Sequence, residues 1–222
     1  MGTHDGPDHG LVVRGDIENF KDLRGKAVAV SRAGGGADVV ARLILEKHGM
    51  VPDKDVKISP LGSDESRVAA LEQGLVAGAS VNMIHALTLE KRGYRVLGWA
   101  FDEVDFPFNC ICTTVEKIKD RPDEVKKVLR AFLKSVKFIR EEREQTISLM
   151  VEWSGMNKEL AEKSYEMIAR NFNATGEPKP EGIRTVLQQA KKEMRLTEDV
   201  AVSRVADFSL LKAVHKELGI TR

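Results

Sequence analysis

Aromatic side chains are scarce in this chain of 222 residues, of which they make up 5%. So few rings argue against a stacking platform for nucleic-acid bases and against a sugar cleft lined with rings. A charge excess is also absent, since 35 Lys and Arg stand against 34 Asp and Glu, a formal net charge of +1. No global field would therefore concentrate nucleic acid or an anionic membrane on the surface. These absences predict no nucleic-acid partner and favour a small polar ligand.

Long hydrophobic runs are absent too. No run approaches the roughly 18 apolar residues of a membrane span, and no basic segment followed by an apolar one opens the chain. The sequence as it stands therefore predicts neither a membrane span nor a signal segment. Its opening is polar and rich in glycine, which predicts a flexible lead-in and crossover over residues 1–20. We expect His4 and His9 there to be incidental rather than metal ligands.

Cysteine is limited to two residues, Cys110 and Cys112, in an apolar run. On a strand this spacing puts both thiols on one face, where a disulfide is poorly placed, and no third cysteine completes a zinc site. We therefore expect buried free thiols and no metal site. This cysteine usage does not settle the redox compartment.

Strand-like and helix-like segments alternate between Lys26 and Thr114. The pattern predicts strands at 27–30, 55–59, 77–81 and 95–100, with helices at 38–47, from 63 onward and at 86–91. Repeated strand-helix units indicate a mostly parallel sheet with right-handed crossovers. The predicted fold class is therefore α/β, with one α/β lobe over residues 21–114.

Residues 115–222 are predicted to be almost entirely helical. Apolar stripes indicate helices from Pro122 to about residue 139 and at 157–170, 180–194 and 207–218, the second capped by Asn157. Amphipathic helices must bury their apolar stripes. Either these helices form a bundle of their own, or they cover a second sheet that is absent from the chain.

A candidate binding loop follows the strand at 27–30. Ligands of open α/β sheets bind beyond the carboxyl ends of strands, where loop N–H groups and a helix N-terminus converge. Here Ser31 offers a hydroxyl and Arg32 a planar cation. Gly34, Gly35 and Gly36 allow close backbone approach, and the next helix offers free N–H donors to a carboxylate, sulfonate or phosphate. In the alternative interpretation the glycines only make a tight turn and Arg32 is a solvated charge.

The same loop is a poor match to a dinucleotide site. Three consecutive glycines are not the G-x-G-x-x-G pattern, and the next strand ends at Ser59-Pro60 without an acid for a ribose. The sequence therefore predicts no cofactor.

Catalytic residues are not evident either. His48, His85 and His215 fall on separate helices or their ends, which is typical of surface or capping histidines. Asp102, Glu103 and Asp105 form an acidic turn that either contacts a cation or amine or is a solvated loop. We therefore predict no catalytic residue.

Several motifs follow one another in a recognisable order. They are Asp22-Leu-Arg-Gly-Lys26 before the glycine loop, Leu45-Glu-Lys-His-Gly49, Pro52-Asp-Lys-Asp-Val56, Ala69-Ala-Leu-Glu-Gln-Gly74, Arg92-Gly-Tyr-Arg-Val-Leu97, the helix from Arg121-Pro-Asp-Glu-Val125 to Ala131, and Asp207-Phe-Ser-Leu-Leu211. This order, over roughly residues 11–219, resembles the substrate-binding proteins of nitrate/sulfonate/taurine-type ABC importers, which include the NMT1/THI5-like group.

The resemblance implies a type II periplasmic-binding-protein fold, in which two α/β lobes close on a solute outside the cytoplasm. It implies a small polar or anionic solute, an ABC permease as partner, a periplasmic or extracytoplasmic location and no catalysis. Carried over by position, the ligand-binding residues would be those of the loop Ser31–Gly36, Ser63, and Asn82 at the end of the small-residue strand.

Two departures from the family pattern bear on this expectation. Family members carry further N-terminal residues that supply a signal segment and the first strands of lobe one, so the chain looks truncated. An incomplete lobe one predicts a homodimer, strand exchange or a relocated helix pack. The family also often has an Asp-Ala pair where this chain has Gly78-Ala-Ser-Val81, which puts the ligand type in doubt.

Two other functions stay open. One is an enzyme on the same scaffold, similar to the thiamin-pyrimidine synthases, although their cysteine-rich motif has no match here. The other is a sensory or structural module that uses its helices for partner binding.

Overall fold

The computed structural model describes residues 2–3, 6–105 and 107–220 of the chain. They divide into two compact units. The α/β unit is Gly6–Val104. The helical unit is Asp105–Arg222, and the short N-terminal strand β1 (Gly2–Thr3) also belongs to it. The units thus divide about ten residues before the boundary predicted at Thr114.

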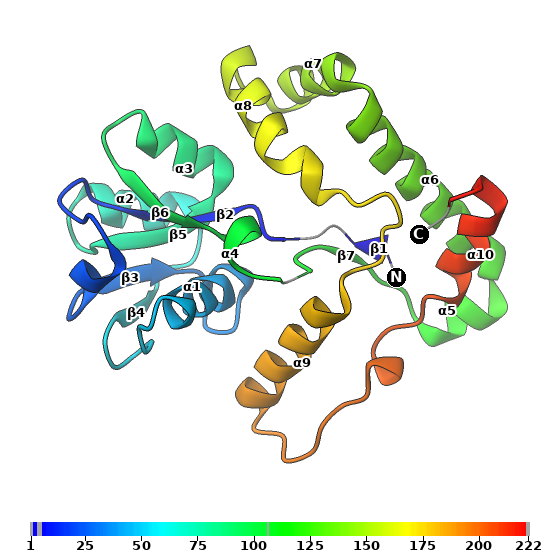
Figure 1. The fold of residues 1–222 in the computed structure, drawn as a ribbon, viewed down its shortest axis with the longest axis horizontal. Helices are drawn as coiled ribbons and strands as arrows, with labels where there is room; N and C mark the ends of the chain where they lie inside the picture. The colour runs from blue at the N-terminus through cyan, green and yellow to red at the C-terminus, as the bar shows by residue number, and fades with distance from the viewer. Residues whose placement is uncertain (1, 4–5, 106, 221–222) are drawn as a thin grey trace. The chain divides into compact units, whose positions relative to one another are not determined.

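A five-stranded mixed sheet forms the centre of the α/β unit (Figure 1). Its strands lie in the order β4 (Lys57–Pro60), β3 (Ala27–Val30), β5 (Gly78–Asn82), β2 (His9–Val13) and β6 (Arg95–Trp99). β3 is parallel to both β4 and β5, whereas β2 is antiparallel to β5 and β6. The predicted α/β class is confirmed. The prediction of a mostly parallel sheet was only partly right, because β2 is antiparallel to both of its neighbours.

Strand β2 corrects the prediction of a flexible lead-in over residues 1–20. All five of its residues are buried, and Leu11, Val12 and Val13 have no exposed surface. This apolar run is buried because both faces of an internal strand are covered. At the end of this segment a 3-10 helix, η1 (Phe20–Leu23), begins with a capping box from Asn19. His4 lies outside the described residues.

Helices cover both faces of the sheet. Side chains alternate between the faces along each strand, so Val28 and Val30 pack with α1 (Gly36–Lys47), while Ala29 packs with α2 (Asp64–Glu72) and α3 (Met83–Glu90). The short helix α4 (Ala100–Glu103) contributes Ala100 to the α1 side. Two apolar cores thus hold the loops at the strand ends in place.

The helical unit pairs β1 with β7 (Cys110–Ile111) over two residues each. Its helices are α5 (Val115–Asp120), α6 (Pro122–Glu141), α7 (Arg143–Ser154), α8 (Lys158–Ile168), α9 (Pro180–Met194) and α10 (Ser209–Leu218), with 3-10 turns η2 (Ala169–Asn171) and η3 (Val202–Arg204). The structure confirms Pro122 in the first turn of α6, Asn157 as the cap of α8 and the bounds of α9. The sequence analysis missed α5 and α7.

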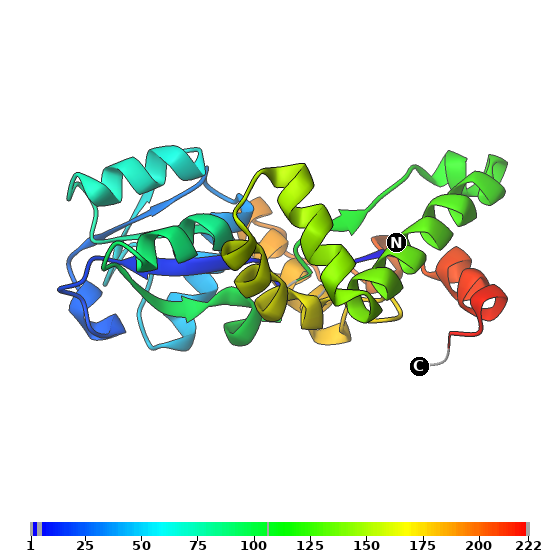
Figure 2. The same cartoon turned by 90° about the horizontal axis from the view of Figure 1, so that it is seen from above.

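Pairs of helices make the cores of this unit. α6 packs against α10 through Leu129, Leu133, Leu211 and Val214 (Figure 2). α7 packs against α8 through Ile147, Ala161 and Tyr165, and the hydroxyl of Tyr165 also donates to the carbonyl of Ile139 in α6 at 2.7 Å. Among the described residues of the unit, the helices therefore pack on one another rather than on a large sheet.

The two cysteines were predicted to be buried, and that prediction was wrong. Cys110 and Cys112 are both free and exposed. β7 pairs over only two residues, and neither cysteine belongs to an apolar core of the unit. No described helix is long and apolar enough to cross a membrane.

Candidate functional site

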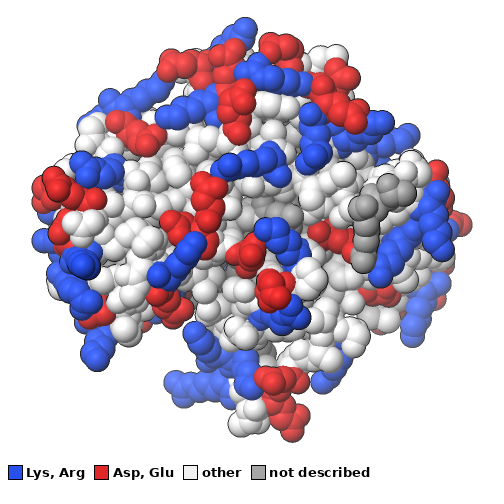
Figure 3. Space-filling view, in the orientation of Figure 1, with Lys and Arg blue, Asp and Glu red and all other residues white. Residues whose placement is uncertain are grey.

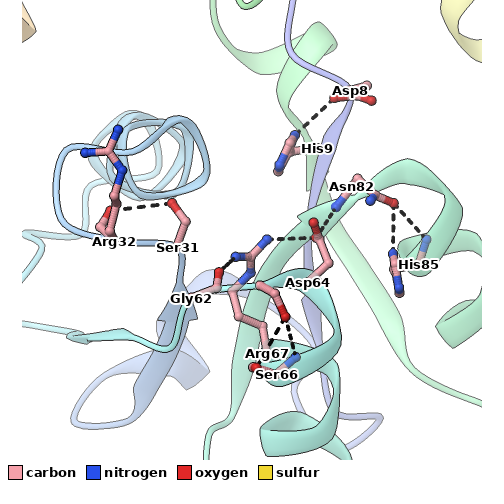
Figure 4. A network of polar contacts seen from close by, with 11 residues as sticks. Asp8, His9, Ser31, Arg32, Gly62, Asp64, Ser66, Arg67, Asn82 and His85 are labelled. Atoms are coloured by element: carbon pink, nitrogen blue, oxygen red, sulfur yellow. Dashed lines mark hydrogen bonds and ion pairs between the residues drawn. The ribbon is translucent and has the colours of Figure 1, made fainter.

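Three loops meet at one edge of the α/β unit. β4, β3 and β5 are parallel neighbours, so their carboxyl ends lie at the same edge of the sheet. The loop Ser31–Gly35 follows β3, the turn at Gly62–Ser63 comes shortly after β4, and Asn82 is the last residue of β5. Figure 4 shows Ser31, Gly62 and Asn82 near one another. The structure thus brings the predicted site residues of all three loops to one place.

Glycine sets the shape of the first loop. Gly34 has φ +70°, a conformation that strains any side chain. Gly35 is buried, and a Cβ there would stand 2.5 Å from Ser31 Oγ. Its N–H donates to the carbonyl of Arg32 at 2.9 Å. The side chain of Ser31 therefore occupies space that only a glycine at position 35 leaves open.

The N-terminus of α1 opens from this loop. Gly35 is the N-cap and supplies no capping side chain. The N–H groups of Gly36 and Ala37, the first two helical residues, have no acceptor within the helix. Gly36 is half-buried and Arg32 exposed, so backbone donors and a cation are offered at the same helix end.

One of the N–H donors predicted to be free at this loop, that of Gly34, is already bound by Asp38. Its carboxylate is 3% exposed, and Oδ2 accepts the N–H of Gly34 at 2.8 Å. Oδ1 accepts Nε of Arg42 at 2.9 Å, and Arg42 also binds Asp53 at 2.7 Å. Burial tends to lower the pKa of Arg42, but these two carboxylates outweigh it and raise the pKa. Asp38 therefore stiffens the loop from inside and consumes one of its donors.

An ion pair between a partly buried aspartate and a buried arginine joins the other two loops. Asp64 Oδ1 accepts the guanidinium of Arg67 at 2.8 Å and the N–H of Asn82 at 2.9 Å. Arg67 is 2% exposed and also donates to the carbonyl of Gly62. Its Nε has no hydrogen-bond partner among the described residues. Asp64 and Arg67 therefore fix the ends of β4 and β5 relative to each other.

The predicted side chains of Ser63 and Asn82 serve as helix caps. Ser63 Oγ accepts the N–H of Ser66 at 3.3 Å and caps α2. Asn82 Oδ1 accepts the N–H of His85 at 3.1 Å, caps α3 and lies 3.1 Å from Nδ1 of the same histidine. Their oxygens already have partners, so their part in ligand binding stays a prediction.

Sequence reasoning missed several residues that shape this edge, namely His9, Asp38, Asp64 and Arg67. His9 is 8% exposed, lies opposite Asn82 in the β2–β5 register, and its Nδ1 is 3.1 Å from Asp8 Oδ1. The two aspartates and Arg67 carry a signal that was available: an acid in the first turn of a helix with Arg three or four residues later. His9 carried none, because its strand had been taken for a lead-in.

The electrostatics around these loops are mixed. The hydroxyl of Ser63 holds the pKa of the exposed Glu65 below its usual range, so that carboxylate is ionised near the rim. Over the face that Figure 3 shows, acidic and basic side chains are interspersed. On that face the two signs therefore alternate and do not form one broad basic patch.

The other candidate residues for chemistry are dispersed. His48 lies 3.3 Å from Glu103 and stacks on Phe20, while His215 bonds the carbonyl of Thr175. Of the predicted acidic turn, Glu103 is bound by Lys47 in the α/β unit, and Asp105 pairs with Lys179 in the helical unit. Among the described residues no three His, Cys, Asp or Glu side chains gather to hold a metal.

Comparison with solved structures defines the class of fold. The periplasmic sulfonate-binding protein SsuA of Methylobacillus flagellatus KT matches with a TM-score of 0.72 and 19% identity, over 99% of this chain and 68% of its own. The aliphatic sulphonate-binding protein SsuA of Escherichia coli matches with a TM-score of 0.67 and 19% identity, over 91% and 68%. The desulfurization enzyme DSZB matches with a TM-score of 0.61 and 16% identity, over 98% and 79%. The fold is that of the type II periplasmic binding proteins.

The family follows from the sequence itself. The model of the family described as NMT1/THI5 like matches residues 4–146, well over half of the chain. This chain therefore belongs to the NMT1/THI5-like family, as its motifs indicated. No curated protein matches it significantly.

Proposed function

We propose that this protein is the extracytoplasmic solute-binding component of an ABC importer and that it binds a small polar or anionic organic solute without catalysis. The observation that carries the proposal is the loop Ser31–Gly35 with the uncapped N-terminus of α1. N–H groups at a helix start, together with a hydroxyl and a guanidinium, suit a sulfonate, carboxylate or phosphate group. The family and the sulfonate-binding relatives support the same class of solute.

The proposed partner is an ABC permease, and the proposed location is the periplasm or its equivalent outside the cytoplasm. Both come from what the two sulfonate-binding relatives are. The homodimer predicted from the sequence remains a prediction, to be checked by native mass spectrometry of the purified protein.

Calorimetric titration with a series of alkanesulfonates and the matching carboxylates tests the proposal. We expect saturable binding that Arg32→Ala weakens about tenfold, because a charge-assisted hydrogen bond is lost. Lys57→Ala is the matched control, since Lys57 is an exposed cation at the opposite end of β4 and should bind as the wild type does. Binding that neither substitution alters would remove the site from this edge.

An enzyme is the second candidate, because DSZB shows that the fold also carries catalysis. Incubating the protein with each bound solute and following the solute by mass spectrometry separates the two. Unchanged solute over many hours supports a binding protein, and conversion at stoichiometry above one supports an enzyme.

A further inference from the structure

The side chain of Asp38 places a negative charge at the helix end that the proposed solute site uses. Asp38 is the third residue of α1 and is buried. Both of its oxygens accept hydrogen bonds, as those of an ionised carboxylate do. A helix N-terminus carries the equivalent of roughly half a positive charge, and a carboxylate in the first turn carries a full negative one. By itself, Asp38 would therefore make the start of α1 repel an anion.

Arg42 supplies the opposite charge. It lies one helical turn after Asp38, and its Nε donates to Oδ1 of Asp38 at 2.9 Å. Within the described part of the chain, Arg42 is the only basic side chain in contact with Asp38. Its second partner, Asp53, is exposed, so water and salt screen that carboxylate. The charge of Arg42 thus balances that of Asp38, and the donors at the start of α1 keep their attraction for an anion.

The geometry of Asp38 and its charge are separable. Its Oδ2 accepts the N–H of Gly34 at 2.8 Å and so shapes the loop before α1, a contact that does not involve Arg42. Its charge acts at a distance on whatever binds at the helix start. Asparagine at position 38 keeps an oxygen that can accept the N–H of Gly34 but has no charge. A substitution can therefore remove the charge and leave the loop contact in place.

We infer that Arg42 is a positioning residue of the proposed solute site: it holds and neutralises Asp38, and it thereby sets the preference of the site for an anion over a neutral solute. This role rests on the proposed function. Arg42 acts on the solute through Asp38 and not by touching the solute. The preference for an anion thus depends on a pair of side chains in α1 as well as on the exposed Arg32.

The test compares 1-butanesulfonate with 1-butanesulfonamide, which has nearly the same size and no charge. Calorimetric titration of the wild type should show a preference for the sulfonate. Arg42→Met should weaken binding of the sulfonate about tenfold, because the charge of Asp38 is then unbalanced near the bound anion. Binding of the sulfonamide should stay as in the wild type, since a neutral solute does not respond to that charge.

Three further variants distinguish charge from structure. Arg42→Lys keeps the cation and should retain the preference for the sulfonate. Asp38→Asn should bind the sulfonate at least as tightly as the wild type does, because it removes a negative charge. The double variant Asp38→Asn, Arg42→Met should recover the affinity that Arg42→Met loses. An ion pair with a merely structural role would instead weaken binding of both solutes in all of these variants except Arg42→Lys.

Arg92→Met is the matched control. It removes the same charge from the α/β unit, and Arg92 also pairs with a carboxylate, that of Glu72, at 2.6 Å. Glu72 is the last residue of α2, and Arg92 follows the C-terminal end of α3, so this pair lies at the helix ends away from the candidate site. We expect both solutes to bind this variant as they bind the wild type. Circular dichroism establishes that each variant is folded.

The backbone N–H signal of Gly36 in a proton–nitrogen NMR spectrum reports where the sulfonate binds. Sulfonate binding that shifts this signal and is equally tight in Arg42→Met overturns the inference and leaves the proposed function intact. Equal loss of both solutes in Arg42→Met, without recovery in the double variant, also overturns it. Binding that leaves Gly36 unmoved removes the solute site from α1, and the inference with it. If the wild type binds neither the alkanesulfonates nor the matching carboxylates, the proposed function and the inference both fail.

Discussion

The two units of this protein bury their apolar side chains in different ways. In the α/β unit the sheet is covered on both faces, and among the described residues one core holds 15 buried side chains and the other nine. In the helical unit the corresponding clusters hold four and three. A sheet with helices on both sides therefore builds a larger core from fewer residues than helix pairs do.

Because of this difference, the α/β unit holds its loops rigidly, whereas the helical unit leaves apolar side chains accessible to solvent. Two loops of the candidate solute site lie at the ends of β3 and β5, whose side chains are mostly buried, so their backbone donors are held in fixed positions. The helical unit instead leaves large side chains such as Trp153 in solvent. We expect the α/β unit to recognise a ligand by preset geometry and the helical unit to offer apolar surface.

The largest expected effects come from removing one buried leucine in each unit. Leu45→Ala in the α/β unit should lower the free energy of unfolding by about 4 kcal/mol, because Leu45 has no exposed surface and its surroundings cannot collapse. Leu133→Ala, at a site 2% exposed in the α6–α10 cluster, should cost about 2 kcal/mol, since a small cluster relaxes more easily.

Urea denaturation of both variants, combined with hydrogen exchange resolved by peptide, checks this difference. Each substitution should increase exchange in its own unit more than in the other. Equal losses of stability, or equal deprotection of both units by either substitution, would contradict a stability difference between the units.

The next effect concerns two ion pairs of the same spacing. Asp64 and Arg67 are three residues apart, with Arg67 buried and Asp64 partly buried, whereas Asp123 and Lys126 have the same spacing in α6, with Asp123 exposed. Asp64→Asn should cost about 2–3 kcal/mol, because it leaves Arg67 without its counter-charge in a buried position. Asp123→Asn should leave stability unchanged within error.

Thermal and chemical unfolding of the two variants measures this pair. The double variant Asp64→Asn, Arg67→Met removes the unpaired charge and should recover much of the loss. If Asp64→Asn alone is neutral, the pair does not hold the β4 and β5 ends together.

A smaller effect compares glycines with positive φ. Gly25 and Gly34 flank β3 at φ +72° and +70°, and Gly155 ends α7 at φ +70°. Alanine at any of the three should cost about 1 kcal/mol, because each would hold a side chain in the left-handed region. Only Gly34→Ala should also weaken binding of an alkanesulfonate, since Gly34 belongs to the loop before α1.

Calorimetric titration of the Gly25→Ala and Gly34→Ala proteins separates strain from recognition. Equal affinities in the two variants would show that the loop plays no part in solute binding.

Local signals predicted much of this structure. The strand at 27–30 and the helix at 180–194 have the predicted bounds, because a short apolar run and a proline followed by an amphipathic stripe are both decided by neighbours in sequence. The glycine loop of the candidate site was predicted from the same local order, and the other two loops from the family resemblance. The parallel pairing of their strands brings all three together.

Long-range pairing accounts for most of what was missed. Residues 9–13 become an internal strand only by pairing with segments about 70 and 90 residues later. The residues next to them in the sequence do not predict that pairing. The sequence places Asp64 and Arg67 as a pair on one helix, but the hydrogen bond from the N–H of Asn82 to Asp64 depends on the fold. The exposure of Cys110 likewise depends on which elements pack on β7, and the sequence pattern of a strand does not predict them.

The smallest expected effect is a pH dependence that differs between the units. Partial burial would raise the pKa of Glu103 in the α/β unit, but hydrogen bonds from Lys47 and His48 outweigh it and lower the pKa. In the helical unit, hydrogen bonds from Lys117 and Arg121 lower the pKa of the exposed Glu124. A lowered carboxyl pKa stabilises the folded state above the unfolded value, about 4.3, and this contribution is lost as the pH falls through the folded value.

Unfolding of the Glu103→Gln and Glu124→Gln proteins between pH 7 and pH 3 compares the two carboxylates. Glu103→Gln should lower the free energy of unfolding at pH 7 by less than about 1 kcal/mol, since surface ion pairs are screened by solvent. The difference from the wild type should shrink as the pH falls below the unfolded value, because the wild-type carboxylate is then increasingly protonated. Glu124→Gln should show the smaller difference of the two, because its carboxylate is more exposed than that of Glu103. A loss in Glu103→Gln that does not change with pH would mean that packing, rather than charge, holds α4 against α1.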